Sequence, residues 1–239
     1  MSEATVSRLR ERLDVVRERI SAAARKSGRE AEDVRLLVAS KYYDASQMEA
    51  LREAGVRLVG ENRAEDLISK QEEFAESFEW HFIGHVQRRK ARLVVPRVEM
   101  IHSVDSVRLV EELAKRAGER PVEVLLQVNV SGEESKYGVP ESEVEALLEA
   151  AAGSGGKVDV RGFMTLAPLV ERPEDVRYVF ARLREVRDRL RASWRGDFDL
   201  QELSMGMSDD YAVAVEEGST IVRIGRVLIE EGGPVRRQE

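Results

Sequence analysis

The side chain with the clearest chemical capacity in this sequence is that of Lys41. It directly follows the apolar run 34–40, which is typical of a buried parallel strand, so we expect its amine to project from the strand's carboxyl end. An amine can lose its proton and form a Schiff base with a carbonyl compound, whereas a guanidinium cannot. Only seven of the 38 Lys and Arg residues are lysines, so a lysine at this position indicates carbonyl chemistry.

A second group of residues could bind an anion opposite that amine. Residues 204–208 and 223–226 follow two later apolar runs, and their small residues would let backbone N–H groups approach a phosphate. We expect Asp209 and Asp210 to turn their carboxylates toward the amides of the next helix, away from the anion. The residues expected to form this phosphate cup are Ser204, Gly206, Ser208, Gly225 and Arg226.

An amine and an anion site that face each other match a phosphorylated aldehyde or ketone, and pyridoxal 5'-phosphate is the foremost cofactor of that type. Arg223 would meet the pyridine nitrogen and keep it unprotonated, because a guanidinium cannot accept a hydrogen bond. Asn62, His81 and Met164 lie on or next to predicted strands and complete the expected cofactor contacts. Plainer interpretations stay open. Asn62 and His81 could be ordinary hydrogen-bonded residues, while Met164 could fill the core and Arg223 could form an ion pair at the rim.

These residues are positioned by an alternation of strands and helices. Residues 2–26 carry apolar side chains at helical spacing before the first strand. Strands are predicted at 34–40, 56–60, 79–83, 100–104, 122–130, 158–164, 200–204 and 220–224. Seven helices are predicted between consecutive strands, at 45–54, 63–74, 87–95, 106–117, 141–152, 173–191 and 208–217.

Eight strands separated by helices match a closed (β/α)8 barrel of the TIM type, in which the carboxyl ends of all strands meet at one face. An open doubly wound sheet is disfavoured because no G-x-G-x-x-G follows the first strand. We therefore predict an α/β chain that forms one barrel domain over residues 1–239, with an additional N-terminal helix.

Composition excludes several classes of function. The net charge is −7 with both signs interspersed, which argues against a nucleic-acid partner. The chain has no cysteine, and its three histidines lack the spacing of a zinc site, so we expect no metal. With no signal peptide and no long apolar span, we expect a cytoplasmic protein without a membrane partner, and we expect it to be a monomer.

Several motifs in order along the chain resemble those of the pyridoxal phosphate homeostasis protein family, of the YggS or PROSC type. The matching motifs are Val38-Ala39-Ser40-Lys41, Gly60-Glu61-Asn62, Trp80-His81-Phe82-Ile83-Gly84 with Gln87 and Lys90, Asn129-Val130-Ser131, Ser135-Lys136-Tyr137-Gly138, Arg161-Gly162-Phe163-Met164, Leu203-Ser204-Met205-Gly206-Met207-Ser208-Asp209-Asp210, Gly218-Ser219-Thr220 and Val222-Arg223-Ile224-Gly225. They cover nearly the whole chain, and their combination is highly specific.

The resemblance implies a fold like the N-terminal barrel domain of alanine racemase, with pyridoxal phosphate held as a Schiff base on Lys41. It also implies Arg223 near the pyridine nitrogen and phosphate contacts from Ser204, Ser208 and Gly225. Members of the family are regarded as carriers or regulators of the cofactor pool without an established catalytic activity. Lys90 and Lys136 are thought to assist cofactor binding or transfer, as secondary or relay amines.

The sequence departs from the family pattern near the expected site. Tyr42 and Tyr43 follow Lys41 where the family usually has Thr and a nearby Pro, so the first loop could cover the cofactor differently. Arg226 stands where many members have Thr or Ser, and Arg89 stands where Asn is frequent. The phosphate cup is therefore the part of the resemblance that transfers least directly.

Two classes of function that use the cofactor remain in view, beside a lysine-dependent aldolase that needs no cofactor and would show no yellow absorbance as purified. The first is a non-enzymatic protein that stores pyridoxal phosphate, buffers it or delivers it to pyridoxal-phosphate-dependent apoenzymes, with no catalytic residues. The second is a racemase or decarboxylase that acts on amino acids. Racemases of this fold draw a catalytic tyrosine from a second domain that this sequence has no room for, and Arg223 would weaken carbanion stabilisation. The sequence therefore favours the non-enzymatic class.

Overall fold

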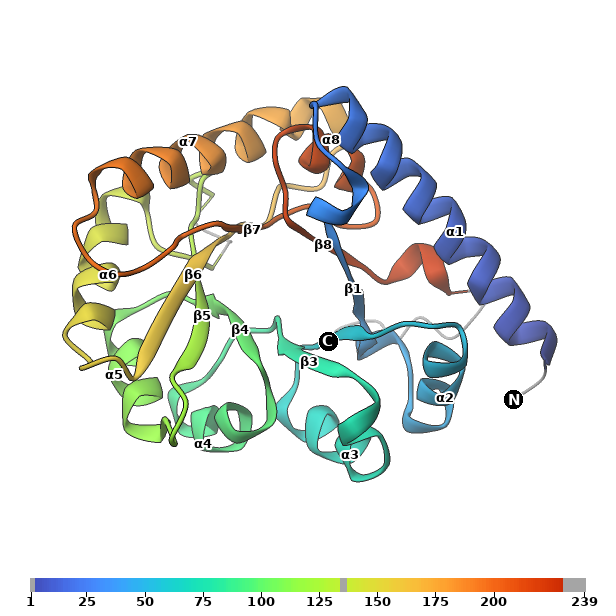
Figure 1. The fold of residues 1–239 in the computed structure, drawn as a ribbon, viewed down its shortest axis with the longest axis horizontal. Coiled ribbons are helices and arrows are strands. Elements are labelled where there is room, and N and C mark those ends of the chain that lie inside the picture. Colours follow the sequence, from blue (N-terminus) through green and yellow to red (C-terminus); the bar gives the residue numbers. More distant parts are fainter. Residues whose placement is uncertain (1–2, 134–136, 230–239) are drawn as a thin grey trace.

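The structure is a computed structural model that describes residues 3–133 and 137–229. In this part of the chain eight parallel strands form a closed barrel in sequence order, as Figure 1 shows. The strands are β1 (Arg35–Ala39), β2 (Leu58–Glu61), β3 (Glu79–Phe82), β4 (Met100–Val104), β5 (Val122–Gln127), β6 (Val158–Met164), β7 (Glu202–Ser204) and β8 (Ile221–Ile224). The barrel closes where β1 pairs with β8, with Leu37 opposite Arg223. The predicted barrel fold is confirmed.

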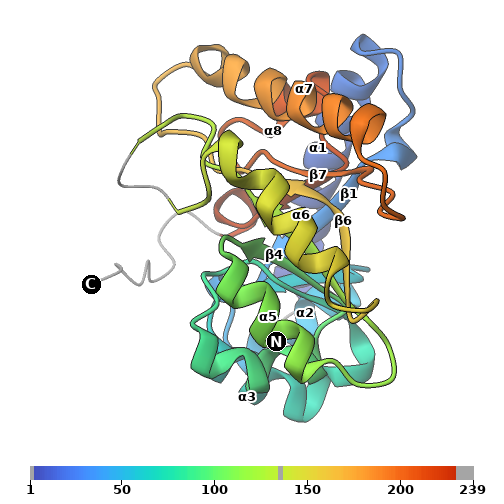
Figure 2. The same cartoon turned by 90° about the vertical axis from the view of Figure 1, so that its left-hand side faces the viewer.

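The helices surround the barrel, as the two perpendicular views in Figures 1 and 2 show. They are α1 (Glu3–Lys26), α2 (Ala45–Glu53), α3 (Ala64–Phe74), α4 (Ala91–Val94), α5 (Val107–Arg116), α6 (Val144–Ala152), α7 (Arg177–Ser193) and α8 (Tyr211–Glu216). The additional helix α1 packs against α2 and α8, because its buried residues recur every three or four positions along one face. None of the helices in the described residues is both long and apolar enough to cross a membrane.

Three predicted boundaries are wrong near the expected site. The first strand ends at Ala39, and Ser40–Tyr42 form a 3-10 turn, so Lys41 lies in that turn. The helix predicted at 87–95 is a 3-10 turn (Arg88–Lys90) followed by the single turn α4. The helix predicted from residue 208 begins at Tyr211. In each case the chain forms a short turn with local hydrogen bonds, where the apolar pattern alone indicates that the strand or helix continues.

The strands have two faces with different contents. Alternate residues point inward, where Leu37, Met100 and Met164 belong to a small apolar cluster inside the barrel. Their neighbours Val38 and Ile101 belong to the large cluster between the barrel and the helices. The same alternation turns four polar residues into the barrel, because each lies two positions from an inner residue or beside an outer one. These four residues are His81, His102, Ser204 and Arg223.

Candidate functional site at the carboxyl-terminal face

Lys41 lies at the carboxyl-terminal face of the barrel, immediately after β1. Its side chain is exposed, and its Nζ lies 5.0 Å from the centre of the Tyr42 ring, within the range of a cation–π contact. The Tyr42 ring packs directly on Gly225, where any Cβ would collide with it. The amine and the loop after β8 are therefore neighbours, joined by a tyrosine that departs from the family pattern.

The turn that carries Lys41 is fixed by a buried ion pair, which we call the Lys70 cluster and which consists of Ser40, Glu61 and Lys70. Nζ of Lys70 donates to Oε2 of Glu61 at 2.5 Å and to the carbonyl of Ser40 at 2.8 Å. The Ser40 hydroxyl donates to the same carboxylate oxygen at 2.8 Å. The Glu61 side chain is fully buried and that of Lys70 is 6% exposed. The backbone just before Lys41 is thus tied to the end of β2.

Asn62 follows that carboxylate and has an unused acceptor. Its backbone N–H donates to Oε1 of Glu61 at 2.7 Å. Its side-chain Oδ1 is buried and has no hydrogen-bond partner among the described residues. A buried acceptor without a donor costs free energy, so this atom is suited to receive a hydrogen bond from a ligand.

The loops after β7 and β8 lie against each other, as a phosphate cup requires. The backbone N–H of Gly225 donates to the Ser208 hydroxyl at 3.4 Å. Gly206 has φ +91, and a Cβ there would lie 2.6 Å from that of Ala214, so the loop depends on glycine. The structure therefore brings Ser208 and Gly225 together, while the phosphate cup itself stays a prediction.

The predicted roles of the two aspartates are wrong. Asp209 forms an ion pair with Arg226, and both side chains are more than half exposed. Asp210 is the N-cap residue of α8, but its Oδ1 accepts from the backbone N–H of Met207 at 2.6 Å and no helix amide reaches it. Each carboxylate instead accepts from a donor outside the helix: Asp210 from the backbone N–H of Met207, and Asp209 from the guanidinium of Arg226. Arg226 is thus held by a carboxylate at the rim of the cup.

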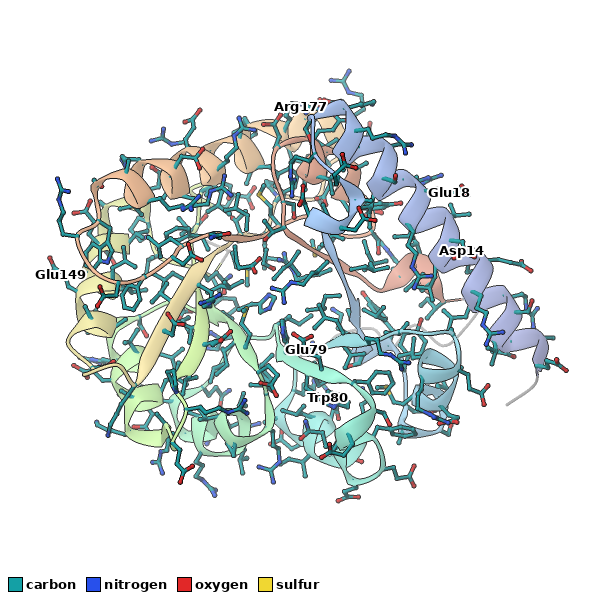
Figure 3. The ribbon with its side chains drawn as sticks, in the orientation of Figure 1. Asp14, Glu18, Glu79, Trp80, Glu149 and Arg177 are labelled. Carbon is teal, nitrogen blue, oxygen red and sulfur yellow. The ribbon has the colours of Figure 1, made fainter. Side chains whose placement is uncertain are left out.

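The four polar residues inside the barrel form a continuous series with Glu79, which we call the histidine chain. Arg223 donates to the Ser204 hydroxyl oxygen at 2.5 Å, and the same hydroxyl lies 2.9 Å from Nδ1 of His102. Nε2 of His102 lies 2.9 Å from Nδ1 of His81, and Nε2 of His81 lies 2.9 Å from the carboxylate of Glu79. In Figure 3 Glu79 lies on the side of β3 that faces the barrel interior and Trp80 on the side toward α3.

Burial decides the charges along this chain. Arg223 is 5% exposed, and burial lowers its pKa to about 10, which leaves it charged at neutral pH. Burial puts the pKa of His102 well below its ordinary value, and the positive charge of Arg223 lowers it further, so this ring is neutral. The hydrogen bond from His81 lowers the pKa of Glu79, which therefore remains a carboxylate.

The remaining predicted residues lie outside this arrangement. Met164 is buried within the inner apolar cluster at the end of β6. Lys90 pairs with Glu65 at 2.7 Å. Lys136 lies outside the described residues.

The sequence did not reveal two residues of the site, Lys70 and His102, or the contact between Tyr42 and Gly225. Lys70 is one of the polar residues of a predicted helix, and nothing local distinguishes it from a solvated lysine. His102 gave a usable signal, because it stands two residues after Met100 in a predicted strand and therefore shares its inward face. The position of Tyr42 depends on the packing of two loops that are far apart in sequence.

The fold and site place the chain in a known class. Residues 12–230 match the family model described as the N-terminal domain of alanine racemase. A pyridoxal phosphate homeostasis protein of Aquifex aeolicus is 42% identical over 92% of this chain and 97% of its own length, and one of Pseudomonas aeruginosa is 39% identical over 93% and 95%. The chain belongs to the pyridoxal phosphate homeostasis protein family.

A solved structure supports the same relationship. PipY of Synechococcus elongatus, a structure described as having pyridoxal phosphate bound, matches with a TM-score of 0.79 at 32% identity and covers 93% of this chain and 100% of that one. A relative with the same fold thus binds pyridoxal phosphate.

Proposed function

We propose that this chain binds pyridoxal 5'-phosphate at the carboxyl-terminal face of the barrel, with Lys41 as the covalent attachment point, and serves the homeostasis or delivery of the cofactor. The observation that carries the proposal is the combination of an exposed lysine amine, the adjoining Ser208–Gly225 loops and the unpartnered Oδ1 of Asn62. The names of the relatives and the bound cofactor in PipY support it.

The residues present fit the chemistry of this cofactor. When bound, pyridoxal phosphate supplies an aldehyde that reacts with primary amines. Asn62 offers an acceptor for a ring hydroxyl, and Ser208 with the backbone of Gly225 offers donors for a phosphate. The Ser204 hydroxyl is engaged by His102 and Arg223, so we assign Ser204 the support of Arg223 and leave the phosphate to the other loop residues.

Arg223 argues for a quiet site. Its guanidinium is charged and can only donate hydrogen bonds, so a pyridine nitrogen beside it stays unprotonated and withdraws electrons weakly. Held in this way, the cofactor is suited to storage and to delivery to apoenzymes. We therefore propose no turnover of amino acids.

Covalent attachment is tested by borohydride reduction of the protein loaded with pyridoxal phosphate, followed by peptide mass mapping. We expect the pyridoxyl group on the peptide that contains Lys41, and no label in Lys41→Ala. Lys90→Ala is the matched control, since Lys90 is engaged by Glu65 and its loss should leave the label in place. Label found chiefly on Lys70 or Lys90 would contradict the assignment.

Delivery and catalysis are separated by a second experiment. Loaded protein is mixed with a pyridoxal-phosphate-dependent apoenzyme while free cofactor is trapped, and recovery of that enzyme's activity would support direct delivery. The same loaded protein is incubated with amino acids. Racemisation or decarboxylation at about 1 to 1000 per second that disappears in Lys41→Ala would instead establish an enzyme.

A further inference from the structure

Two buried histidines, His81 and His102, have both ring nitrogens hydrogen-bonded to protein groups. The sequence predicts His81 as a cofactor contact, but the proposed function does not use it, because neither of its ring nitrogens is left for a ligand. His81 is 1% exposed and His102 is fully buried, and they stand between Glu79 at the start of β3 and Arg223 on β8. Burying two imidazoles in the centre of a barrel is costly unless their hydrogen bonds are satisfied, and each ring nitrogen here has a partner.

The carboxylate end of the histidine chain sets its direction when both rings are neutral, because Glu79 can only accept. At the other end the Ser204 oxygen accepts from Arg223, and the Ser204 hydroxyl keeps a proton that it can donate to Nδ1 of His102. His102 then carries its proton on Nε2 and donates to Nδ1 of His81. His81 likewise carries its proton on Nε2 and donates to Glu79, which as a carboxylate can only accept. Each link has one donor and one acceptor when both rings are neutral.

If His81 takes up a proton from solvent, the link between His81 and His102 and the link between His102 and Ser204 must both reverse, while the link to Glu79 keeps its direction. His81 would then donate from both nitrogens, and His102 would have to accept at Nε2 and donate from Nδ1. The Ser204 oxygen would receive donors from both His102 and Arg223, and its own proton would lose its acceptor. The charge state of His81 thus determines how firmly Ser204 holds the Arg223 guanidinium.

We propose that His102 and His81 are positioning residues for Arg223, and that they transmit the charge state at the amino-terminal face of the barrel to the cofactor face. This inference rests on the proposed function only in that Arg223 faces the cofactor ring. The neutral chain fixes the Ser204 lone pair toward the guanidinium, and Arg223 also donates to the carbonyl of Thr165 at 2.9 Å, so its orientation is fully determined.

Other charged groups affect the balance between the two hydrogen-bond orders of the histidine chain. Arg35 of β1 lies 3.6 Å from the Glu79 carboxylate and 2.9 Å from Glu202 of β7, so it competes with His81 for Glu79. Arg35 and Glu202 also line a cavity of about 570 Å³ at the amino-terminal face. The negative charge of Asp210, the N-cap residue before α8, raises the pKa of Arg223. The positive charge of Arg223 in turn lowers the pKa of His102. Glu79 is 44% exposed, which gives the chain access to solvent protons at this end.

The direction of the chain is tested without any cofactor by nitrogen-15 NMR of histidine-labelled protein. The sequence has three histidines, so His85→Gln leaves only the two of interest. We expect both rings as neutral Nε2–H tautomers at pH 7.5, and we expect Ser204→Ala to move the Nδ1 signal of His102 toward that of an unbonded acceptor. A Nδ1–H tautomer at His102, or no response to Ser204→Ala, would overturn the proposed order.

The positioning role is tested by cofactor binding, followed by absorbance, in two variants of His102. His102→Leu removes both hydrogen bonds, whereas His102→Asn keeps an acceptor in reach of Ser204 and loses His81. We expect a dissociation constant for pyridoxal phosphate at least about 10-fold higher in His102→Leu and substantial rescue in His102→Asn, since each tenfold change corresponds to about 1.4 kcal/mol. Equal binding by wild type and His102→Leu, or no rescue by Asn, would overturn the role.

Transmission across the barrel is tested at its far end, where a variant is least disruptive to folding. Glu79→Gln keeps a hydrogen-bond acceptor for His81 and removes the charge. We expect the pH profile of the bound cofactor's absorbance to shift by at least about half a unit, and an unchanged profile would overturn transmission. If wild type itself binds no pyridoxal phosphate, the proposed function fails, and the NMR experiment still decides the order of the chain.

Discussion

The molecule contains two buried polar networks that satisfy their groups in different ways. The Lys70 cluster lies between α3 and the ends of β1 and β2, and it joins two full charges. The histidine chain runs inside the barrel, and its two central members, His81 and His102, are imidazoles that hydrogen-bond to each other. The first network holds the turn that carries Lys41, just after β1, and we propose that the second positions Arg223, which lies on the neighbouring strand β8.

The difference matters for what each network can do. Two full charges held together away from water have one favourable arrangement, so the Lys70 cluster acts as a fixed brace. A series of neutral rings can exchange its donors and acceptors, so the histidine chain can adjust to pH at little cost. The backbone before Lys41, the proposed attachment point, is therefore rigidly held, whereas the residue that we propose to face the cofactor ring is adjustable.

The strongest test of the brace is Lys70→Met. It leaves the buried Glu61 carboxylate without a counter-charge, and we expect the free energy of unfolding to fall by about 3 to 5 kcal/mol, measured by urea denaturation. The double variant Lys70→Met with Glu61→Gln removes both charges and should recover part of that loss. Lys90→Met is the matched control at an exposed ion pair and should cost less than about 1 kcal/mol. Equal effects at Lys70 and Lys90 would remove the distinction between a buried brace and a surface pair.

Removing one ring from the histidine chain should cost less than removing one charge from the brace. In His102→Leu the Ser204 hydroxyl and Nδ1 of His81 both lose a partner, and neither is a full charge. We expect the free energy of unfolding to fall by about 1 to 3 kcal/mol in the same urea experiment. A loss larger than that of Lys70→Met would mean that the histidine chain, and not the ion pair, is the more rigid element.

The fold was predictable because alternating apolar runs and helical patterns report burial directly. Eight strands and the N-terminal helix follow from that signal, and so does the position of Lys41 after the first strand. Strand ends were less certain: β5 stops at Gln127 although the apolar pattern continues to Val130, because Val128 pairs instead with Val139. The apolar pattern shows that a segment is buried, but it does not show which other segment pairs with its backbone.

The site was predictable only where residues are adjacent to strand ends. Asn62 and Gly225 follow strands directly, Ser208 lies in the loop after β7, and the structure brings Ser208 and Gly225 together. The partner of Glu61 lies nine residues later on a helix, and that of Asp209 lies 17 residues later on another loop. Such pairings depend on the packed geometry, which explains why the predicted helix-capping role of Asp209 was wrong.

The histidine chain also predicts how stability depends on pH. The pKa of His102 is lowered in the folded protein, whereas the unfolded chain takes up a proton as the pH falls below about 6.5. The contribution of a neutral His102 is therefore complete above about pH 6.5 and is lost as the pH falls below it, by up to about 1.4 kcal/mol per unit. Urea denaturation of wild type and His102→Asn between pH 5 and 7.5 should show a steeper loss in wild type. Parallel curves would mean that His102 is protonated in the fold.

The smallest effect is expected at the rim of the phosphate cup, where neither network reaches. Arg226 pairs with Asp209, and the two side chains are 57% and 54% exposed, so solvent screens their attraction and Arg226→Ala should change the free energy of unfolding by less than about 1 kcal/mol. The effect of Arg226→Ala on ligand binding decides what this arginine does in a position where the family often has a hydroxyl.

If Arg226 contributes to the proposed phosphate cup, Arg226→Ala should weaken pyridoxal phosphate binding but leave pyridoxal binding unchanged, because only pyridoxal phosphate carries the anion. Asp209→Asn is the matched variant: it releases Arg226 from its partner and should strengthen phosphate binding. Unchanged affinity for pyridoxal phosphate in both variants would assign Arg226 to solvent and leave the anion to Ser208 and the backbone of Gly225.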